Sequence, residues 1–235
     1  MSTSAMRSIH HCVAVCLLAL AWCVTVPCPA TPAPRPNIVF FLIDDRGYTD
    51  VGYHGGAIKT PNIDWLAAAG AKLEAFYVQP VCSPTRAALI TGRYPMRHGL
   101  QVGVVRPWAQ CGLPLDERTL AQALKEAGYA TAICGKWHLG HFAPECLPTR
   151  RGFDHQYGHY NGMIDYFDHT RDGGFDWHRD DQASRDAGYS TTLLGNESVR
   201  LITQHDLAKP LFLYIPFNAP PAPLQALPEH LKLYE

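Results

Sequence analysis

The chain has 235 residues, of which 47% are hydrophobic and 17% are charged, a composition typical of a globular protein rather than a disordered one. Its 20 Lys and Arg residues nearly balance its 21 Asp and Glu residues, and the formal net charge is -1. Because no field of one sign covers the whole chain, the composition argues against a nucleic-acid-binding protein, and any binding of anions must be local.

The N-terminal segment has the three parts of a secretory signal peptide. Arg7 precedes an apolar run over residues 12–26, and the segment closes on the small residue Ala30. A membrane span needs about 20 apolar residues, and this run stops at Pro27 after fewer. We therefore expect cleavage of residues 1–30, a secreted, periplasmic or lysosomal protein, and no stable membrane span; retention of the segment as an anchor is the alternative.

Residues 31–36 form a proline-rich linker that suits neither a helix nor a central strand, so the folded domain is expected over 37–235. The continuous apolar run over 38–43 predicts a strand that is buried on both faces of a sheet. Asp44 and Asp45 follow this strand directly, at the carboxyl end where ligands bind in parallel sheets.

Helical and strand patterns then alternate along the chain. Thr60 is predicted to cap one helix and Asp116 another, and Gly70, Gly92 and Gly128 are predicted to end helices. Predicted helices span 61–69, 82–91, 117–127 and 191–208, and predicted strands span 71–78, 129–139 and 211–217. This order indicates an α/β fold with a largely parallel sheet. The Gly-, Asp-, His- and Tyr-rich stretch over 151–188 is longer than most structural connections, which suggests that it lines a site.

The adjacent carboxylates of Asp44 and Asp45 repel each other and lose hydration unless a cation neutralises them. Ligand sets made only of oxygen favour Ca²⁺ or Mg²⁺ over Zn²⁺. An isolated Asp-Asp pair is, however, often a pair of solvated turn residues, so the metal interpretation depends on the other motifs.

Cys82 stands at the start of the helix predicted over 82–91, where unpaired N–H groups and the helix dipole favour an anion. Pro84 fixes the first turn, and the guanidinium of Arg86, one turn further on, can reach the same anion. Without the other motifs, the sequence CSPTR (82–86) is equally compatible with a buried structural cysteine.

The remaining cysteines of the expected mature chain are Cys111, Cys134 and Cys146. Four cysteines in an oxidising compartment normally form two disulfides, in one of three possible pairings. If Cys82 takes part in chemistry, at most one internal disulfide can form, and its pairing stays open.

Several motifs resemble the sulfatase family, in the same order along the chain. CSPTRAALITGRYP (82–95) is similar to the Cys-x-Pro-x-Arg signature that directs oxidation of the cysteine to formylglycine. NIVFFLIDDRGYTDVGYHG (37–55) resembles the metal-binding strand of the family, and GKWHLG (135–140) resembles its segment with a catalytic lysine and histidine. LPLDERTLAQALKEAGYAT and ECLPTRRGFDHQYGHYNGMIDYFDH are similar to the arylsulfatase B-like branch, which acts on N-acetylgalactosamine 4-sulfate. The resemblance covers about residues 36–227.

The resemblance implies an alkaline phosphatase-like α/β/α sandwich and a hydrolase that cleaves sulfate esters of small molecules or glycans. A maturation enzyme would convert Cys82 to formylglycine, whose hydrate attacks sulfur. Asp44, Asp45 and the Cys82-derived group would bind one divalent cation, Ca²⁺, and Arg86 would stabilise the nucleophile.

The same resemblance implies that Lys136 is catalytic and binds the sulfate oxygens of the substrate, and that His138 holds or deprotonates the hydrate. On the strand predicted over 129–139, both side chains point to one side while Trp137 points to the other. We therefore expect Lys136 and His138 to face one cavity.

Two departures from the family pattern concern turnover. Pro221 stands where the family has a histidine that contacts the sulfate and helps the leaving group, and proline cannot transfer a proton. Further metal ligands of the family, an Asp-Asn pair, and another sulfate-binding lysine would follow beyond Glu235, so we expect an N-terminal portion of a sulfatase. One alternative is a catalytically impaired family member that at most binds sulfated glycans. Another is a phosphohydrolase of the alkaline phosphatase superfamily, although that branch uses Ser or Thr and two zinc ions.

Overall fold

The computed structural model describes residues 35–235, so the expected signal peptide lies outside the described residues. None of the helices in this part combines the length and apolar character that a membrane crossing requires. The cysteines at 82, 111, 134 and 146 are all unpaired among the described residues, so none of the possible disulfides forms there.

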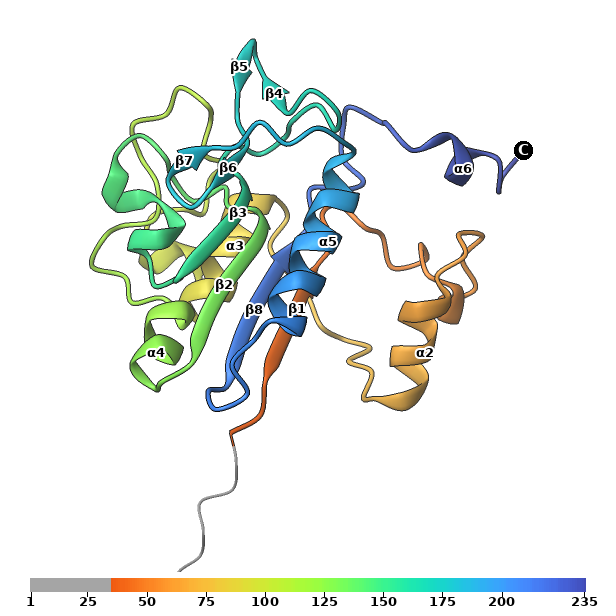
Figure 1. The fold of residues 1–235 in the computed structure, drawn as a ribbon, viewed down its shortest axis with the longest axis horizontal. Coiled ribbons are helices and arrows are strands. Elements are labelled where there is room, and N and C mark those ends of the chain that lie inside the picture. The colour runs from red at the N-terminus through yellow and green to blue at the C-terminus, as the bar shows by residue number, and fades with distance from the viewer. Residues whose placement is uncertain (1–34) are drawn as a thin grey trace, which may run out of the picture. The chain divides into compact units, whose positions relative to one another are not determined.

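A mixed sheet of six strands organises the described residues (Figure 1). In spatial order the strands are β1 (Ile38–Leu42), β8 (Leu211–Pro216), β2 (Ala130–Lys136), β3 (His155–His159), β6 (His178–Arg179) and β7 (Gln182–Ala183). The first four strands run parallel, and β6 and β7 continue the sheet in antiparallel fashion. The largely parallel sheet predicted from the sequence is therefore confirmed.

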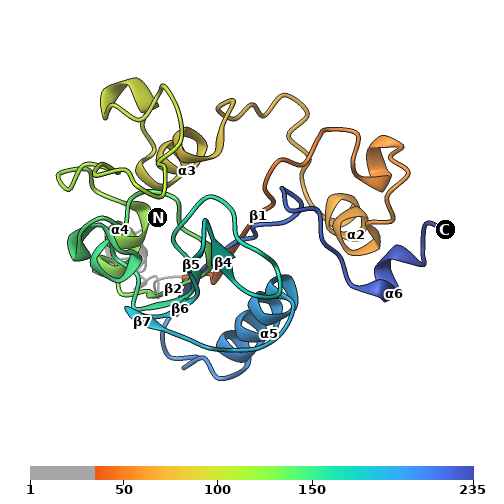
Figure 2. The same cartoon turned by 90° about the horizontal axis from the view of Figure 1, so that it is seen from above.

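Helices cover both faces of this sheet (Figure 2). One face carries α3 (Cys82–Thr91) and α4 (Leu120–Glu126), and the other face carries α5 (Ser190–Thr203). Alternate residues of β2 and β8 serve two separate hydrophobic cores because successive side chains of a strand point in opposite directions. One core includes Ala87, Ile90, Ala121, Ile133, Phe212 and Tyr214, and the other includes Cys134, Leu194, Leu211, Leu213 and Ile215. The α/β/α layering is confirmed.

β1 differs from its predicted environment. Its apolar run predicted burial on both faces, but Val39 is 40% exposed and Phe41 is 56% exposed, whereas Ile38, Phe40 and Leu42 pack against the core of α3 and α4. The physical reason is its position: β1 is the edge strand of the sheet, and α5 packs on β2, β3 and β8.

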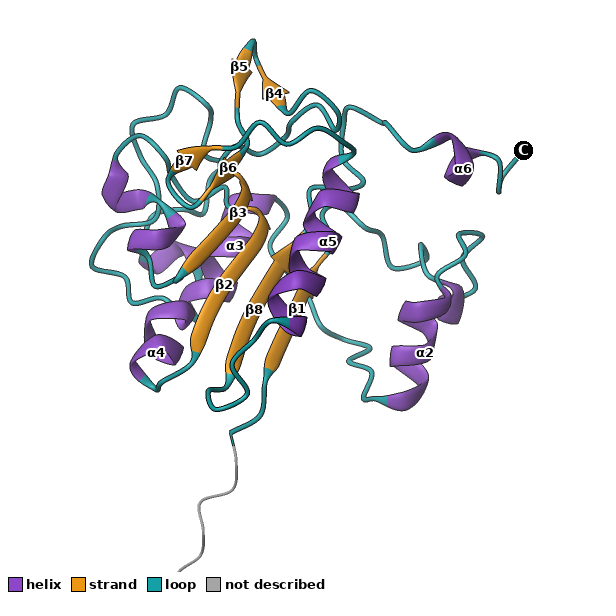
Figure 3. Cartoon of the chain, in the orientation of Figure 1, coloured by secondary structure: helices purple, strands orange, loops and turns teal. Residues whose placement is uncertain are grey.

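The remaining helical elements are short (Figure 3). They are α2 (Pro61–Ala69), α6 (Pro228–Leu231) and the 3-10 turns η1 (Gly52–His54), η2 (Pro95–Arg97), η3 (Pro144–Cys146) and η4 (Pro148–Arg150). The predicted helices over 61–69 and 82–91 have the predicted bounds. Gly92 ends α3 in a left-handed conformation with φ 65, which glycine adopts without steric cost.

Four predicted local features are wrong. The cap of α4 is Thr119, which forms a capping box with Gln122, so Asp116 does not cap it. Thr60 makes no side-chain cap hydrogen bond to α2 and instead donates to the Asp64 carboxylate. The predicted strand over 71–78 is an exposed irregular segment with no partner strand among the described residues. The last predicted helix ends at Thr203, before the expected 208.

The stretch over 151–188 adds a hairpin above the carboxyl end of the sheet, made of β4 (Thr170–Arg171) and β5 (Gly174–Phe175). Its two-residue turn has positive φ at Asp172 and at Gly173, 49 and 80, as in the Asp-Gly turns that suit the twist of hairpins. The buried carboxylate of Asp176 accepts hydrogen bonds from the backbone N–H groups of Tyr160 and Asn161, at 3.0 and 2.8 Å. These bonds attach the hairpin to the end of β3.

Candidate functional site

Asp44 lies at the carboxyl end of β1 and is buried. Its N–H donates to the carbonyl of Ala219 at 3.1 Å, so the loops that follow β1 and β8 are joined. Its carboxylate accepts a hydrogen bond from the Lys136 ammonium and lies 3.5 Å from the Arg86 guanidinium. Arg86 also donates to the carbonyl of Lys136 at 2.7 Å. Residues from β1, α3 and β2 thus form one buried charged cluster.

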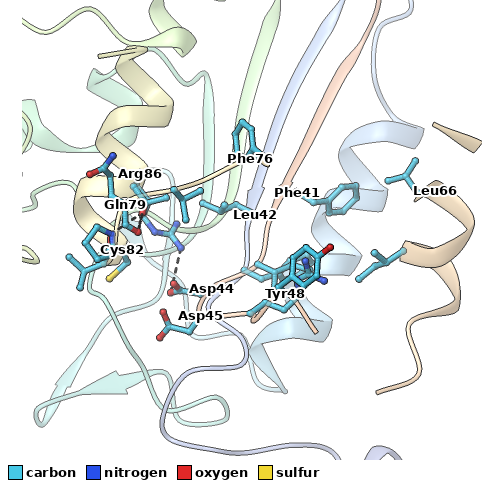
Figure 4. Close-up of a pocket in the computed structure, with 18 of the residues that line it drawn as sticks. Phe41, Leu42, Asp44, Asp45, Tyr48, Leu66, Phe76, Gln79, Cys82 and Arg86 are labelled. Atoms are coloured by element: carbon cyan, nitrogen blue, oxygen red, sulfur yellow. Dashed lines mark hydrogen bonds and ion pairs between the residues drawn. The ribbon is translucent and has the colours of Figure 1, made fainter. Parts of the chain in front are cut away.

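A pocket of about 810 Å³ opens beside this cluster (Figure 4). Asp44, Asp45, Cys82 and Arg86 line it together with apolar side chains that include Phe41. Figure 4 shows Arg86 extending from α3 toward Asp44, with Asp45 and Cys82 beside them. The carboxylates predicted as metal ligands therefore share a pocket with the predicted nucleophile and its arginine.

A second cavity, of about 200 Å³, adjoins the first because Asp45 and Cys82 line both. The cavity is also lined by Lys136, His138 and Pro221. All six residues predicted for the site consequently line one or both of two adjoining spaces. Pro221 thus lines the same cavity as His138. The carbonyl of Pro221 accepts a hydrogen bond from the Tyr166 hydroxyl at 2.9 Å.

The strand predicted over 129–139 ends earlier than expected, at Lys136. His138 has the left-handed φ of 58, so the prediction that Lys136 and His138 alternate along one strand is wrong. Both side chains still line the cavity because the backbone turns at His138. The N–H groups of Trp137 and His138 keep bonds to the carbonyls of His159 and Tyr160, at 2.9 and 3.0 Å.

The imidazole of His138 is held by contacts that the sequence did not predict. Its Nε2 lies 2.8 Å from the carbonyl of Val105, and the hydroxyl of Ser83 donates to the carbonyl of His138 at 2.9 Å. The N–H of Val105 donates back to Ser83 at 3.0 Å. A Cβ at Gly162 would lie 2.4 Å from the imidazole ring, so any other residue at 162 would clash with the ring in its present position.

Burial determines the charge of these side chains. Burial and the neighbouring Arg86 lower the pKa of Lys136, and the Asp44 carboxylate only partly offsets this effect. Burial, Lys136 and Arg86 hold the pKa of His138 well below its ordinary value. The imidazole is therefore neutral at physiological pH. Because Nε2 faces a carbonyl, it carries the proton, and Nδ1 has no hydrogen-bond partner among residues 35–235.

The metal assignment of Asp44, Asp45 and Cys82 stays a prediction. Within the described part of the chain, no group of three or more His, Cys, Asp and Glu side chains is arranged to hold a metal ion. The two carboxylates are hard oxygen donors and fit a cation such as Ca²⁺. A thiol at residue 82 does not fit that preference, whereas the oxygen of a formylglycine hydrate does.

Several cavity-lining residues escaped the sequence analysis. Arg106, Met163 and Arg171 line the smaller cavity with Gly162. The length of the stretch over 151–188 was the only signal for Gly162, Met163 and Arg171, and nothing in the sequence pointed to Arg106. Arg93, at the end of the signature motif, lies outside both spaces and pairs with Glu117.

Comparisons with known proteins agree with this geometry. The family model described as Sulfatase matches residues 36–235. Arylsulfatase J of Mus musculus is 45% identical over 208 residues, which are 85% of this chain and 35% of that protein. N-acetylgalactosamine-6-sulfatase of Mus musculus is 37% identical over 220 residues, 84% of this chain and 42% of that protein.

Solved structures show the same fold. The crystal structure of Ps i-CgsB in complex with k-i-k-neocarrahexaose has a TM-score of 0.79 and 34% identity, covering 86% of this chain and 49% of that one. The structure of BT4656 in complex with its substrate D-glucosamine-2-N,6-O-disulfate has a TM-score of 0.71 and 27% identity, covering 86% and 38%. The chain thus spans half or less of the length of these relatives. From the family match over nearly all described residues, the chain belongs to the sulfatase family.

Proposed function

We propose that residues 37–235 are the N-terminal part of a sulfatase catalytic domain that hydrolyses sulfate esters. The observation that carries this proposal is the convergence of Asp44, Asp45, Cys82, Lys136 and His138, with Arg86, on two adjoining cavities. Groups proposed as metal ligands, nucleophile, base and anion-binding cations of one reaction meet there, although they come from separate segments of the chain.

Residue 82 is the proposed nucleophile, after a maturation enzyme has converted its thiol to an aldehyde. The oxygen of one hydroxyl of the hydrated aldehyde attacks sulfur as its proton passes to His138. The bond between sulfur and the ester oxygen breaks, and that oxygen takes a proton from water to leave as the alcohol. The other hydroxyl then loses its proton, the carbon–oxygen bond to sulfate breaks, and the aldehyde is restored. Asp44, Asp45 and an oxygen of residue 82 would hold one divalent cation, which would supply charge neutralisation for the attack.

The other residues bind and move protons. The Lys136 ammonium binds the sulfate oxygens, and Arg86, which also pairs with Asp44, stabilises the oxyanion of the nucleophile. The neutral imidazole of His138 accepts the proton of the hydrate at Nδ1, the nitrogen that does not face Val105. Proline at 221 leaves the departing alcohol without the family's histidine, and we expect slow release of poor leaving groups.

The proposed substrates are sulfated sugars. BT4656 is described with a disulfated glucosamine as its substrate, and another relative is named for N-acetylgalactosamine 6-sulfate. These names support a sulfated glycan or its fragments as the substrate class of this chain. A secreted, periplasmic or lysosomal location would bring the chain to such substrates.

Mass spectrometry tests the nucleophile directly. In a host that makes formylglycine, the peptide with Cys82 should weigh about 18 Da less than its thiol form. The peptide with Cys111, which is exposed and lies outside both cavities, is the control and should keep its mass. An unmodified Cys82 in such a host would exclude the covalent mechanism.

Activity provides the second readout for the same residue. Cys82→Ala should abolish hydrolysis of 4-nitrocatechol sulfate, whereas Cys111→Ala should leave it unchanged. Hydrolysis that survives Cys82→Ala would show that another group is the nucleophile.

A sulfated-glycan-binding protein without turnover is the second candidate function. The position of Pro221 in the cavity beside Lys136 and His138 favours it, because proline supplies no proton there. Binding of sulfated sugars together with an unmodified Cys82 and no hydrolysis would support this candidate.

A further inference from the structure

The smaller cavity carries more positive charge than the proposed reaction uses. Lys136, Arg106 and Arg171 line it, and Asp45 is the one carboxylate among its lining residues. The reaction assigns a task to Lys136 alone, which already pairs with Asp44. Cations that share a small cavity repel one another unless an anion lies between them. The lining therefore favours a ligand with more than one negative charge.

Arg171 is held in place by the hairpin that carries it. It lies at the end of β4, directly before the Asp-Gly turn, and Thr170 accepts a hydrogen bond from the N–H of Asp165 at 2.8 Å. The other strand is anchored through Asp176 to the end of β3. A cation on such a support reaches a ligand at little further cost in conformational entropy.

The guanidinium of Arg171 has donors to spare. Its Nε lies 3.1 Å from the Asp172 carboxylate, which is its only ion pair with the described residues. The Asp172 side chain is 53% exposed, so water weakens the pair. The two terminal nitrogens remain available, and together they form the fork that suits carboxylate and sulfate oxygens.

The size of the cavity limits what it can hold. Its volume of about 200 Å³ is below the range of about 300–1,000 Å³ typical of pockets for drug-sized ligands. One sugar unit with its charged substituents suits this space better than an oligosaccharide. Cys82 at the start of α3, Arg171 on the hairpin, and the exposed Arg106 are among the residues that line it.

We propose that Arg171, with Arg106 in the lining of the same cavity, determines specificity by binding a second anionic group of the sulfated sugar. The ester sulfate to be cleaved lies at Lys136, and a further sulfate or a carboxylate of the same ligand lies at Arg171. This inference rests on the proposed function, because it takes Lys136 as the site of the first sulfate. It adds a preference that the reaction itself does not require.

Calorimetric titration of the Cys82→Ala chain measures this preference without turnover, in buffer with CaCl₂. The ligands are N-acetylgalactosamine 4-sulfate, its 4,6-disulfate, and a disaccharide that joins a uronic acid to the 4-sulfate. At least one dianionic ligand should bind about ten-fold more tightly than the monosulfate, the effect of a hydrogen bond between charged groups. Preference for the disulfate identifies a second sulfate at Arg171, and preference for the disaccharide identifies a carboxylate.

Substitutions then assign the preference to residues. Arg171→Gln should remove the ten-fold difference between the dianionic ligand and the monosulfate, and Arg171→Lys should keep part of the difference. Arg118→Gln is the matched control, because it removes the same charge from an exposed pair with Glu126 outside the cavity. Thermal unfolding of each variant checks that the chain is folded.

The proposed function and the inference fail differently in this experiment. Lys136→Gln should weaken the binding of all three ligands; if it does not, the proposed function is wrong. If Lys136→Gln weakens all three but wild-type binding shows no preference, or Arg171→Gln leaves the preference intact, only the inference is overturned. A chain that binds none of the ligands overturns both.

Discussion

Asp44 and Asp45 are neighbours in the sequence with opposite environments. The Asp44 carboxylate is buried between Lys136 and Arg86, whereas Asp45 is exposed and has the left-handed φ of 47. Burial of a charge is tolerated only where opposite charges and hydrogen bonds compensate it. Without a bound cation, the two cationic side chains neutralise Asp44, and its carboxylate in turn makes the burial of Lys136 tolerable.

The two aspartates should therefore differ in their effect on stability. Asp44→Asn leaves two buried cations without their anion and should lower the free energy of unfolding by about 3 kcal/mol. Asp45→Asn is the matched control, because asparagine also tolerates the left-handed region, and it should change stability by less than about 0.5 kcal/mol. Urea unfolding in the presence of EDTA measures both values. Equal effects would contradict the assignment of Asp44 as the buried partner of Lys136.

Pro221 offers a test of leaving-group assistance. Pro221→His would place an imidazole beside Lys136 and His138, and the bond from Tyr166 would persist because it uses the backbone carbonyl. We expect the rate of hydrolysis of alkyl sulfate esters to rise. The largest increase expected is about 10²–10⁴-fold, the contribution that a general acid typically makes. Ala222→His, at the exposed neighbouring position outside the cavity, is the control. An unchanged rate in Pro221→His, measured in this chain or a longer one that contains it, would rule out this role of the position.

At the scale of elements, local patterns predicted what depends on neighbours in sequence. The bounds of α3 follow from Pro84 and Gly92, and the buried strand β8 follows from its apolar run. The prediction of a strand over 71–78 was wrong, because an apolar pattern shows only that a segment is able to pair. No strand lies beside this segment among the described residues. Similarly, the exposed face of β1 depends on where α5 packs, which residues 38–43 do not encode.

The joint between α5 and the sheet contains a network centred on Glu197. Its buried carboxylate accepts hydrogen bonds from His155 at 2.8 Å, and from Arg179 and Arg200 at 2.6 Å each. Burial raises the pKa of Glu197, but the bonds from Arg200, Arg179 and His155 outweigh it and lower the pKa from 4.5 to about 2. Elements distant in the sequence are thus linked by one carboxylate.

This network predicts a pH dependence of stability. A carboxylate with a lowered pKa in the folded state contributes stability that is complete above its unfolded value of 4.5 and is lost as the pH falls toward about 2. The shift corresponds to about 3 kcal/mol. The difference in free energy of unfolding between wild type and Glu197→Gln should therefore be largest above pH 4.5 and shrink below it. Urea unfolding at several pH values measures it.

The exposed pair between Arg118 and Glu126 supplies the control for that experiment. Glu126→Gln removes a carboxylate that water already solvates, so its effect should be small at every pH. A loss in Glu197→Gln that is equally small, or that does not depend on pH, would contradict the coupling of Glu197 to its three hydrogen-bond donors.

At the scale of the molecule, the sequence predicted the α/β layering and six candidate site residues, and these six residues line two adjoining cavities. The motifs identified all six residues of the expected site because each lies in a short segment with its own spacing. Ser83, Gly162 and Arg171 could not be found in this way, since their roles arise from contacts with segments that follow or precede them at a distance. Only the resemblance to the sulfatase family, and no local physical pattern, predicted that these separate motifs belong to one site.

The pairing of β1 with β8 determines when the charged cluster around Asp44 can form. Among the described residues, the only strand beside β1 is β8, and Leu211 donates to the side chain of Asn37 across 174 positions of sequence at 2.8 Å. Contacts between residues so far apart in the sequence form late in folding, because a long loop must be ordered first. During synthesis, Asp44 leaves the ribosome well before β8 (Leu211–Pro216), so the charged cluster of Asp44, Arg86 and Lys136 cannot be completed until β8 has been made. A nascent chain released before that moment would carry the nucleophile without the acidic pair in place.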